Sequence, residues 1–243
     1  MGKLKTGTIL QSLVDLLYPR RCPVCGRIVV PKGRFICPDC VGELSWVSQP
    51  VCKRCGKELP VDTAEYCLDC TRHPRSFEGG RALLNYNRTA SRSMAQIKYN
   101  NRREYLDFYA EAMARRLGPA IRRMNAQALV PVPVHPSRMK VRGFNQAEEL
   151  ARRLSKKLGI PVNTGLLRRN RNTIPQKDLN PAQRLKNLQE AFVAVRPPAG
   201  LESVILVDDI YTTGSTVEAC ARALKGAGIE RVYFLSICIS GGR

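Results

Sequence analysis

The thirteen residues from Val204 to Thr216, with the sequence VILVDDIYTTGST, are the most informative stretch of the chain. Four apolar residues lead into two carboxylates, Asp208 and Asp209, and a turn of Thr, Gly and Ser then opens the helical pattern TVEACARALKGAG. We expect a buried strand, an acidic pair at its carboxyl end and a loop that enters a helix. In α/β sheets, ligands bind beyond the carboxyl ends of the strands and beside helix N-termini.

The loop after this strand is suited to a phosphate group, because its hydroxyls and its glycine allow the backbone to approach an anion closely. The residues of this loop are Thr212, Thr213, Gly214, Ser215 and Thr216. The aspartates beside it could hold a ribose diol or the water ligands of Mg²⁺. The stretch therefore predicts a site for a ribose 5-phosphate. The alternative is a structural strand whose acidic end caps a helix and whose polar turn binds nothing.

Eight of the ten cysteines form four C-x-x-C pairs whose first members recur every fifteen residues. Two pairs can surround one metal with four thiolates, so we expect two closed structural Zn²⁺ sites, paired in sequence or cross-braced. Disulfides and iron–sulfur clusters are the alternatives, but no secretory signal is visible and iron–sulfur cysteines are usually spaced less regularly. The expected ligands are Cys22, Cys25, Cys37, Cys40, Cys52, Cys55, Cys67 and Cys70.

The chain has 243 residues, enough for one ordinary domain and one small one. We place the boundary just past the last paired cysteine, with an N-terminal helix and the metal sites in residues 1–73 and an α/β domain in residues 74–243. The formal net charge is +20, and residues 114–190 hold seventeen Lys and Arg against four Asp and Glu. Such a surface attracts a polyphosphate or a nucleic-acid backbone, unless it is only a solvated face.

Strand and helix patterns alternate along the larger domain, which predicts a mostly parallel sheet with helices on both faces. The amphipathic segment 9–17 is too short to cross a bilayer, and no other apolar run is long enough, so we expect no transmembrane segment and a cytoplasmic location. The expected strands are 81–86, 129–134, 191–195, 204–208 and 231–239, and the expected helices are 105–123 and 146–158.

Two further segments complete the expected site. A strand ending in VPVPVHP leads into a turn rich in Pro, Arg and Gly before a helix that opens near Asn145. Basic side chains and backbone amides in this turn could surround a pyrophosphate, or the turn could be a basic loop without a ligand. The polar stretch 166–192 is long enough for a lid or a disordered loop. The candidate pyrophosphate-binding residues are Arg138, Lys140, Arg142 and Gly143.

Several motifs together resemble those of one bacterial family. They are LLYPRRCPVCG at the first cysteine pair, VPVPVHP and RGFNQAEELA in the basic segment, RLKN in the polar stretch and VDDIYTTGST at the acidic strand end. This combination resembles the ComF family of competence proteins, nearly end to end. The last motif alone is similar to the signature of type I phosphoribosyltransferases. The resemblance implies a phosphoribosyltransferase domain behind a double zinc ribbon, with phosphoribosyl pyrophosphate and Mg²⁺ as ligands and a role in DNA uptake.

The resemblance also implies roles for particular residues. Asp208 and Asp209 would be the catalytic acids that orient the ribose, and Arg138 and Arg142 would stabilise the departing pyrophosphate. A lid over residues 175–187 would exclude water from the donor. The family usually has a glycine after Lys98-Tyr99, which is absent here, so Lys98 receives no role. The candidate lid residues are Gln176, Arg184 and Asn187.

Two hypotheses remain open at this stage. The first is an Mg²⁺-dependent phosphoribosyltransferase whose acceptor is a base, an amine or water. The second is a non-catalytic competence factor that uses the same fold as a sensor or scaffold. It would bind single-stranded DNA on its basic surface and meet other DNA-uptake proteins at the inner face of the membrane. Aromatic residues make up only 6% of the chain, which gives base stacking little support. If DNA is a partner, we expect Arg168, Arg169 and Arg171 to contribute to its binding, away from the loop after the acidic strand.

Overall fold

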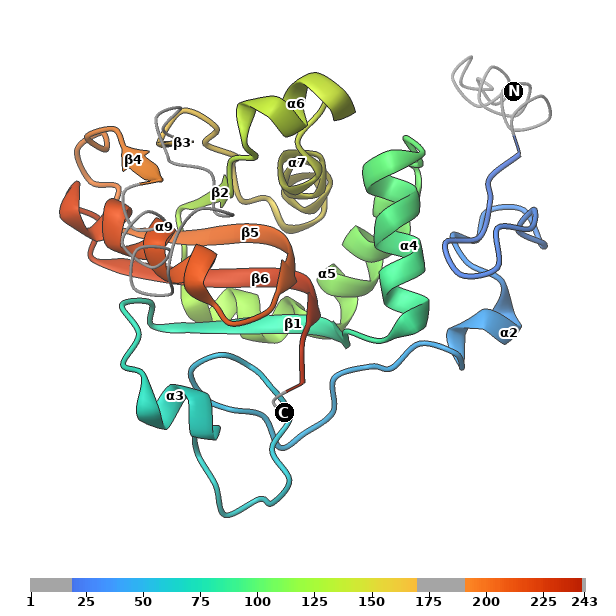
Figure 1. Cartoon of the computed structure of the whole chain (residues 1–243), viewed down its shortest axis with the longest axis horizontal. Coiled ribbons are helices and arrows are strands. Elements are labelled where there is room, and N and C mark those ends of the chain that lie inside the picture. The colour runs from blue at the N-terminus through green and yellow to red at the C-terminus, as the bar shows by residue number, and fades with distance from the viewer. Residues whose placement is uncertain (1–18, 170–190, 242–243) are drawn as a thin grey trace, which may run out of the picture.

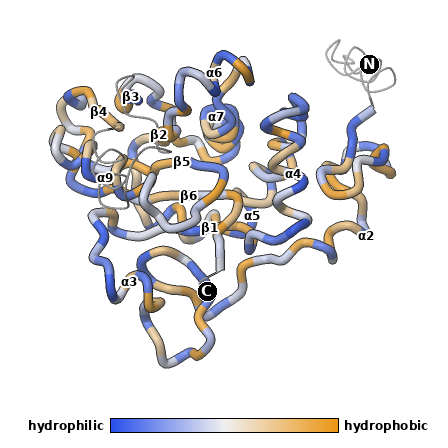
Figure 2. The backbone as a smooth tube through the Cα atoms, viewed as in Figure 1, coloured by the Kyte–Doolittle hydropathy of each residue, from blue (hydrophilic) through white to orange (hydrophobic). Residues whose placement is uncertain are grey.

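The computed structural model describes residues 19–169 and 191–241, in which a parallel sheet carries helices on both faces (Figure 1). All four strands of this sheet run parallel, in the order β1-β6-β5-β2. Figure 2 shows that β5 and β6, in the middle of the sheet, are mostly hydrophobic, as strands covered on both faces must be. The prediction of a mostly parallel α/β sheet is confirmed. The strands are β1 Gly79–Asn85, β2 Ala128–Pro131, β5 Ser203–Tyr211 and β6 Arg231–Ile239.

Alternate residues of the strands enter two separate cores. Leu129, Ile205 and Leu235 pack with α4, α5 and α7 on one face, whereas Val204 and Phe234 pack with α9 on the other. This alternation follows from the two-residue period of a strand. The helices are α4 Arg88–Tyr99, α5 Tyr105–Met124, α7 Gln146–Leu158 and α9 Ser215–Gly226.

The expected strand at 191–195 is confirmed, but it lies outside the four-stranded parallel sheet. It forms β4, Phe192–Ala194, which pairs antiparallel with β3, Leu167–Arg169, in a separate two-stranded sheet. Only Phe192 in β4 is buried, on the face of the main sheet that α9 covers. A strand with one buried residue can cover the edge of a core but lacks the continuous apolar run of a central parallel strand.

The basic turn expected before Asn145 is also different, because most of it forms a short helix, α6, Pro136–Arg142. Pro136 occupies the first turn, where a missing N–H costs nothing, and the His135 side chain accepts a hydrogen bond from the backbone N–H of Ser137. Gly143 ends the helix in a left-handed conformation with φ 73°. Helix α4 was not anticipated at all.

The cysteine-rich segment contains two copies of one local structure. Cys22 N–H donates to the carbonyl of Arg27 at 2.8 Å, and Cys52 N–H donates to that of Lys57 at 2.7 Å. Each copy ends in a short helix, α2 Pro38–Val41 or α3 Leu68–Arg72. We call residues 20–44 the first ribbon and residues 50–72 the second ribbon. Buried residues of the first ribbon join the core containing α4 and α5, and those of the second join the core containing α9.

Within the described residues, no helix is both long enough and apolar enough to cross a bilayer. The amphipathic segment 9–17 lies outside the described residues, as does the expected lid.

Candidate functional site

The expected acidic pair, loop and helix meet at one pocket. Strand β5 carries Asp208 and Asp209 near its carboxyl end, and α9 begins four residues after it ends. Both aspartates line a pocket of about 290 Å³ together with Thr212 and Thr216. The structure thus brings these four residues of the segment to one pocket, and their roles stay a prediction. The other loop residues, Thr213, Gly214 and Ser215, lie between these two threonines.

Gly214 is required by the shape of the loop. Its φ is 77°, and a Cβ atom at this position would lie 2.2 Å from the Tyr211 hydroxyl. Beside it, the hydroxyls of Thr213 and Ser215 are 2.8 Å apart and hydrogen bonded. The loop thus curls against the end of its own strand, and the first N–H groups of α9 follow directly. This is the arrangement that favours an anion at a helix N-terminus.

The two aspartates have different environments. Asp209 is 5% exposed, forms an ion pair with Lys98 and accepts a hydrogen bond from Gln146 Nε2 at 3.2 Å. Burial alone would raise the pKa of Asp209, but Lys98 and Gln146 favour the carboxylate and hold the pKa below its ordinary value. For Asp208, burial and the charge of Asp209 raise the pKa well above its ordinary value. Asp208 is therefore the acid with more to gain from a nearby cation or hydroxyl donor.

Sequence reasoning missed both partners of Asp209. Lys98 lies in the last turn of α4, and its side chain is 17% exposed. Gln146 is the first residue of α7 and is 6% exposed. The buried position of a glutamine could have been suspected from its place between Asn145 and an apolar helical stripe. Lys98 did have a signal in the family resemblance, but it received no role because the glycine that usually follows Lys98-Tyr99 is absent here.

Two arginines line the same pocket as the acids. Arg138 and Arg169 both line it, and within the described residues neither forms an ion pair with a carboxylate. Burial, and then the charge of Arg138, lower the pKa of Arg169. The Arg169 guanidinium lies 5.2 Å from the centre of the Phe192 ring. An anion between these two cations would relieve their repulsion.

The position of Arg169 corrects an expectation. We placed it with Arg168 and Arg171 away from the loop after the acidic strand, but β3 ends at Arg169 and brings it to the same pocket as Asp208. The pairing of β3 with β4 determines this position. Arg171 lies outside the described residues, and so do all three candidate lid residues, Gln176, Arg184 and Asn187.

The remaining pyrophosphate candidates are spread over α6. Lys140 lines a neighbouring pocket of about 460 Å³. Arg142 donates to Gln146 Oε1 at 3.2 Å and lies 5.2 Å from the centre of the Tyr99 ring. Gly143 donates its backbone N–H to the Met139 carbonyl at 2.8 Å. That N–H is already used by the helix end, and the expected backbone contact from Gly143 to a pyrophosphate stays a prediction.

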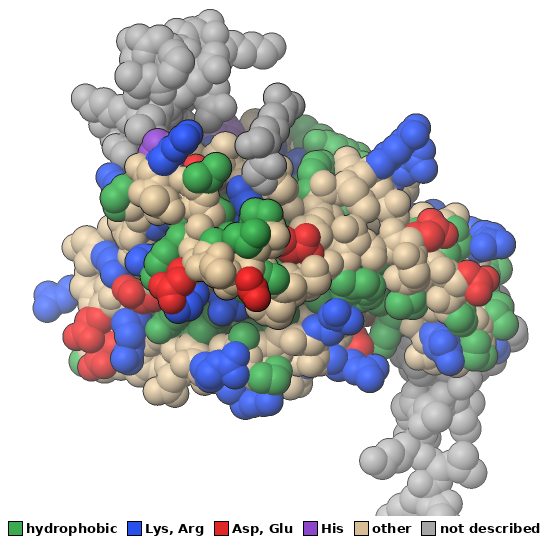
Figure 3. All heavy atoms as spheres, turned by 90° about the horizontal axis from the view of Figure 1, so that it is seen from below, with side chains coloured by type: hydrophobic (Ala, Val, Ile, Leu, Met, Phe, Trp, Pro, Cys, Tyr) green, Lys and Arg blue, Asp and Glu red, His purple; other side chains and the backbone are tan. Residues whose placement is uncertain are grey.

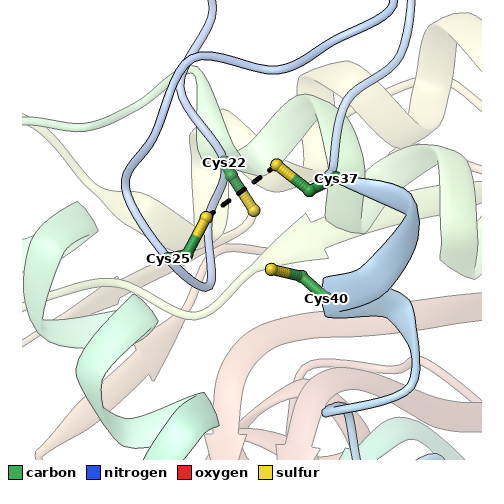
Figure 4. Close-up of side chains that lie close together, drawn as sticks. All are labelled: Cys22, Cys25, Cys37 and Cys40. Carbon is green, nitrogen blue, oxygen red and sulfur yellow. Dashed lines mark hydrogen bonds between the residues drawn. The ribbon is translucent and has the colours of Figure 1, made fainter.

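The eight paired cysteines form two groups of four, and each group combines two C-x-x-C pairs that are consecutive in the sequence. Cys22, Cys25, Cys37 and Cys40 converge in the first ribbon (Figure 4), and Cys52, Cys55, Cys67 and Cys70 converge in the second. Within each group the sulfur atoms lie within 4.8 Å of one another. Cys25 Sγ and Cys37 Sγ are 3.8 Å apart, whereas sulfurs joined in a disulfide are separated by about 2.0 Å. Four convergent sulfurs suit tetrahedral Zn²⁺, with bonds of about 2.3 Å.

Residues 13–71 match the double zinc ribbon domain family. A purine phosphoribosyltransferase from Pyrococcus horikoshii aligns with a TM-score of 0.30 and 19% identity, covering 57% of this chain and 88% of that one.

Sequence relatives cover both parts of the chain. Competence protein ComFC of Bacillus subtilis is 27% identical over 79% of each chain, and the DNA utilization protein YhgH of Escherichia coli K12 is 29% identical over 92% of this chain and 98% of its own. Competence protein F of Haemophilus influenzae is 30% identical over 87% of this chain and 93% of its own. The chain therefore belongs to the ComF family of competence proteins.

Proposed function

We propose that this protein binds phosphoribosyl pyrophosphate together with Mg²⁺ in the pocket beyond β5 and transfers the phosphoribosyl group to an acceptor. The observation that supports the proposal most is that acids, hydroxyl loop and guanidinium groups line one pocket of about 290 Å³. These are the groups that a ribose carrying phosphates at both ends requires. The acceptor can be a base, an amine or water.

The ligand is assigned from the loop outwards. The 5-phosphate binds the residues 212–216 and the first N–H groups of α9. The ribose hydroxyls donate to Asp208 and Asp209, of which Asp209 is held ionised by Lys98. The pyrophosphate lies toward Arg138 and Arg169, whose charges no described carboxylate neutralises through an ion pair.

The proposed reaction breaks the bond between C1 of the ribose and the pyrophosphate oxygen, and the acceptor lone pair forms the new bond to C1. Positive charge grows on the sugar and negative charge on the leaving group. Arg138 and Arg169 stabilise the negative charge on the leaving pyrophosphate. Asp208 and Asp209 orient the sugar and stabilise its positive charge. Mg²⁺, whose oxygen-rich ligand preference fits Asp208 and the hydroxyls beside it, would neutralise pyrophosphate charge when bound. The lid over residues 175–187 remains a prediction.

We further propose that this activity serves DNA uptake in the cytoplasm, because relatives of the chain are named competence proteins. Single-stranded DNA binding is the second candidate and is favoured by the net charge of +20. However, Lys and Arg side chains on the face shown in Figure 3 are interspersed with Asp and Glu. A DNA site on this protein should show affinity that falls steeply with salt, since each neutralised phosphate releases counterions.

Titration calorimetry with phosphoribosyl pyrophosphate and Mg²⁺ tests the first proposal. Asp208→Asn combined with Asp209→Asn should reduce affinity by at least about 100-fold, because two hydrogen bonds to charged groups are weakened at once. The exposed Asp62→Asn serves as the matched control and should bind like the wild type. The proposal fails if the folded double variant keeps wild-type affinity, or if the wild type shows no binding.

A further inference from the structure

The segment Arg75–Phe77 lies between the second ribbon and the loop of residues 212–216. It connects α3 to β1 in sequence, but in space it also contacts the start of α9. Phe77 is fully buried and packs edge-to-face against Phe234, with ring centres 5.1 Å apart. The segment is therefore a fixed part of the core, in contact with two functional elements at once.

Both C-x-x-C turns of the second ribbon hold this segment. Arg54, between Cys52 and Cys55, donates through Nη1 to the carbonyl of Arg75 at 3.2 Å and to that of Phe77 at 2.8 Å. Asp69, between Cys67 and Cys70, accepts from Arg75 Nη2 at 3.0 Å. Each of these two side chains thus stands between two cysteines of the same site, and its position depends on how those cysteines are arranged.

The other side of the segment holds the loop and α9. Arg75 Nη2 donates to the carbonyl of Thr213 at 3.0 Å, and the Arg75 side chain is only 9% exposed. Ser76 donates to Glu218 twice, from its N–H at 2.8 Å and from its hydroxyl at 2.7 Å. One guanidinium group therefore joins Asp69 of the second ribbon to the middle of the loop that receives the 5-phosphate.

The contact at Thr213 controls an N–H group. In a planar trans peptide, the carbonyl of one residue and the N–H of the next point in opposite directions. A hydrogen bond from Arg75 to the Thr213 carbonyl therefore fixes the direction of the Gly214 N–H on the opposite side of the same peptide. Because Gly214, with φ 77°, is a glycine, the peptide that joins it to Thr213 would otherwise rotate more freely than a peptide between two non-glycine residues.

The first ribbon has no comparable connection. Its Arg20 forms an ion pair with Asp107 of α5 at 2.7 Å. Across residues 19–169 and 191–241, no hydrogen bond or ion pair joins residues 20–44 to residues 208–218. The two ribbons thus differ in whether they touch the loop, although their cysteines are arranged alike.

We propose that Arg75 is a positioning residue through which the metal-bound second ribbon sets the conformation of the loop 212–216, so that loss of metal from this ribbon lowers phosphate affinity. Metal binding and the folding of a small ribbon are one event, so removal of the metal frees Arg54 and Asp69 together. The Gly214 N–H then loses its fixed direction. This inference rests on the proposed function only for the identity of the ligand.

The test uses Arg75→Gln in the full chain, with Arg75→Lys as the conservative variant. Hydrogen exchange of the residues 212–216 should become at least about tenfold faster in Arg75→Gln, because each opening now breaks one fewer hydrogen bond to a charged group. Arg75→Lys keeps a donor and should recover part of the protection. Zinc content should stay at the wild-type value in both variants. Arg20→Gln is the matched control in the first ribbon and should leave the exchange of the loop unchanged.

Binding of ribose 5-phosphate provides the second measurement, since this compound carries the phosphate without the pyrophosphate. Affinity should fall at least about tenfold in Arg75→Gln, and also in Cys67→Ser with Cys70→Ser, but not in Cys37→Ser with Cys40→Ser. Wild-type protein that does not bind the compound overturns the proposed function, while the exchange data still decide the role of Arg75. Equal exchange in Arg75→Gln and wild type, or equal losses from the two cysteine variants, overturns the inference.

Discussion

The two ribbons have the same local structure and different surroundings. Gly26 and Gly56 occupy matching positions after the second cysteine of a pair, with φ of 73° and 75°. A Cβ atom on Gly26 would meet nothing within 4 Å, whereas one on Gly56 would lie 2.6 Å from the Gly80 carbonyl oxygen of β1. The turn explains why each is a glycine, but only the second turn is also packed against the sheet. Local sequence determined the ribbons, and tertiary packing distinguishes them.

The same contrast holds for the cysteines. Cys52 and Cys55 of the second ribbon are both fully buried, whereas Cys25 of the first ribbon is exposed. The first ribbon contacts α5 through the ion pair of Arg20 with Asp107. The second contacts the segment that holds the loop. One ribbon thus extends the core beside α4 and α5, and the other supports the site.

The largest effect is expected from removing a metal ligand. Cys52→Ser should destabilise the protein by at least about 4 kcal/mol, because it disrupts a metal site buried against the sheet. Elemental analysis should give about two zincs per chain for the wild type and about one for the variant, and denaturant unfolding gives the free energy. Cys25→Ser should also lose one zinc but cost clearly less. Iron in place of zinc, or one zinc in the wild type, would contradict the assignment.

A medium effect is expected at the two glycines. Gly56→Ala should cost about 2–4 kcal/mol, since the left-handed backbone disfavours a side chain and the new methyl group also clashes with β1. Gly26→Ala should cost only the backbone term, about 1–2 kcal/mol. Thermal and denaturant unfolding of the two variants measure the difference. Equal losses would mean that the second ribbon is packed no more tightly than the first.

The elements that the sequence predicted are those with strong local patterns. The apolar run of β5, the helical stripe of α7 and the spacing of the cysteines each depend on residues that are neighbours in the chain. Helix α4 was not predicted because its residues are mostly polar, although Asn87 caps it by accepting a hydrogen bond from the Ala90 N–H at 2.9 Å. Lys98, in the last turn of that helix, was set aside because the glycine that usually follows it in the family is absent.

Contacts between distant segments could not be predicted from local patterns. Arg169 reaches the pocket only because β3 pairs with β4 across the intervening chain. The contact of Arg75 with Thr213 joins residues 138 positions apart. Nothing in the composition of either segment selects the other, since both the donor and the acceptor are common groups. The acids and the loop were predictable because one short stretch contains them all.

The smallest effect concerns the charged residue that joins the segment 75–77 to α9. Burial alone would raise the pKa of Glu218, but hydrogen bonds from Ser76 and the charge of Arg222 lower it below its ordinary value of 4.5. A lowered folded-state pKa means that Glu218 stabilises the protein at neutral pH and that this contribution is lost as the pH falls below about 4.5 and through the folded-state pKa.

Glu218→Gln should therefore lower the free energy of unfolding by about 1–2 kcal/mol at pH 7. The loss should shrink as the pH falls below about 4.5, because the protonated wild type also lacks the charge. Denaturant unfolding of both proteins across this pH range measures the difference. Asp107→Asn is the matched change beside the first ribbon. Burial alone would raise the pKa of Asp107, but Arg20 and Arg153 lower it below its ordinary value. Its stability loss should follow the same pH trend, but only Glu218→Gln should speed hydrogen exchange in residues 212–216. Faster exchange there in Asp107→Asn would show that both ribbons, and not the second alone, support the loop.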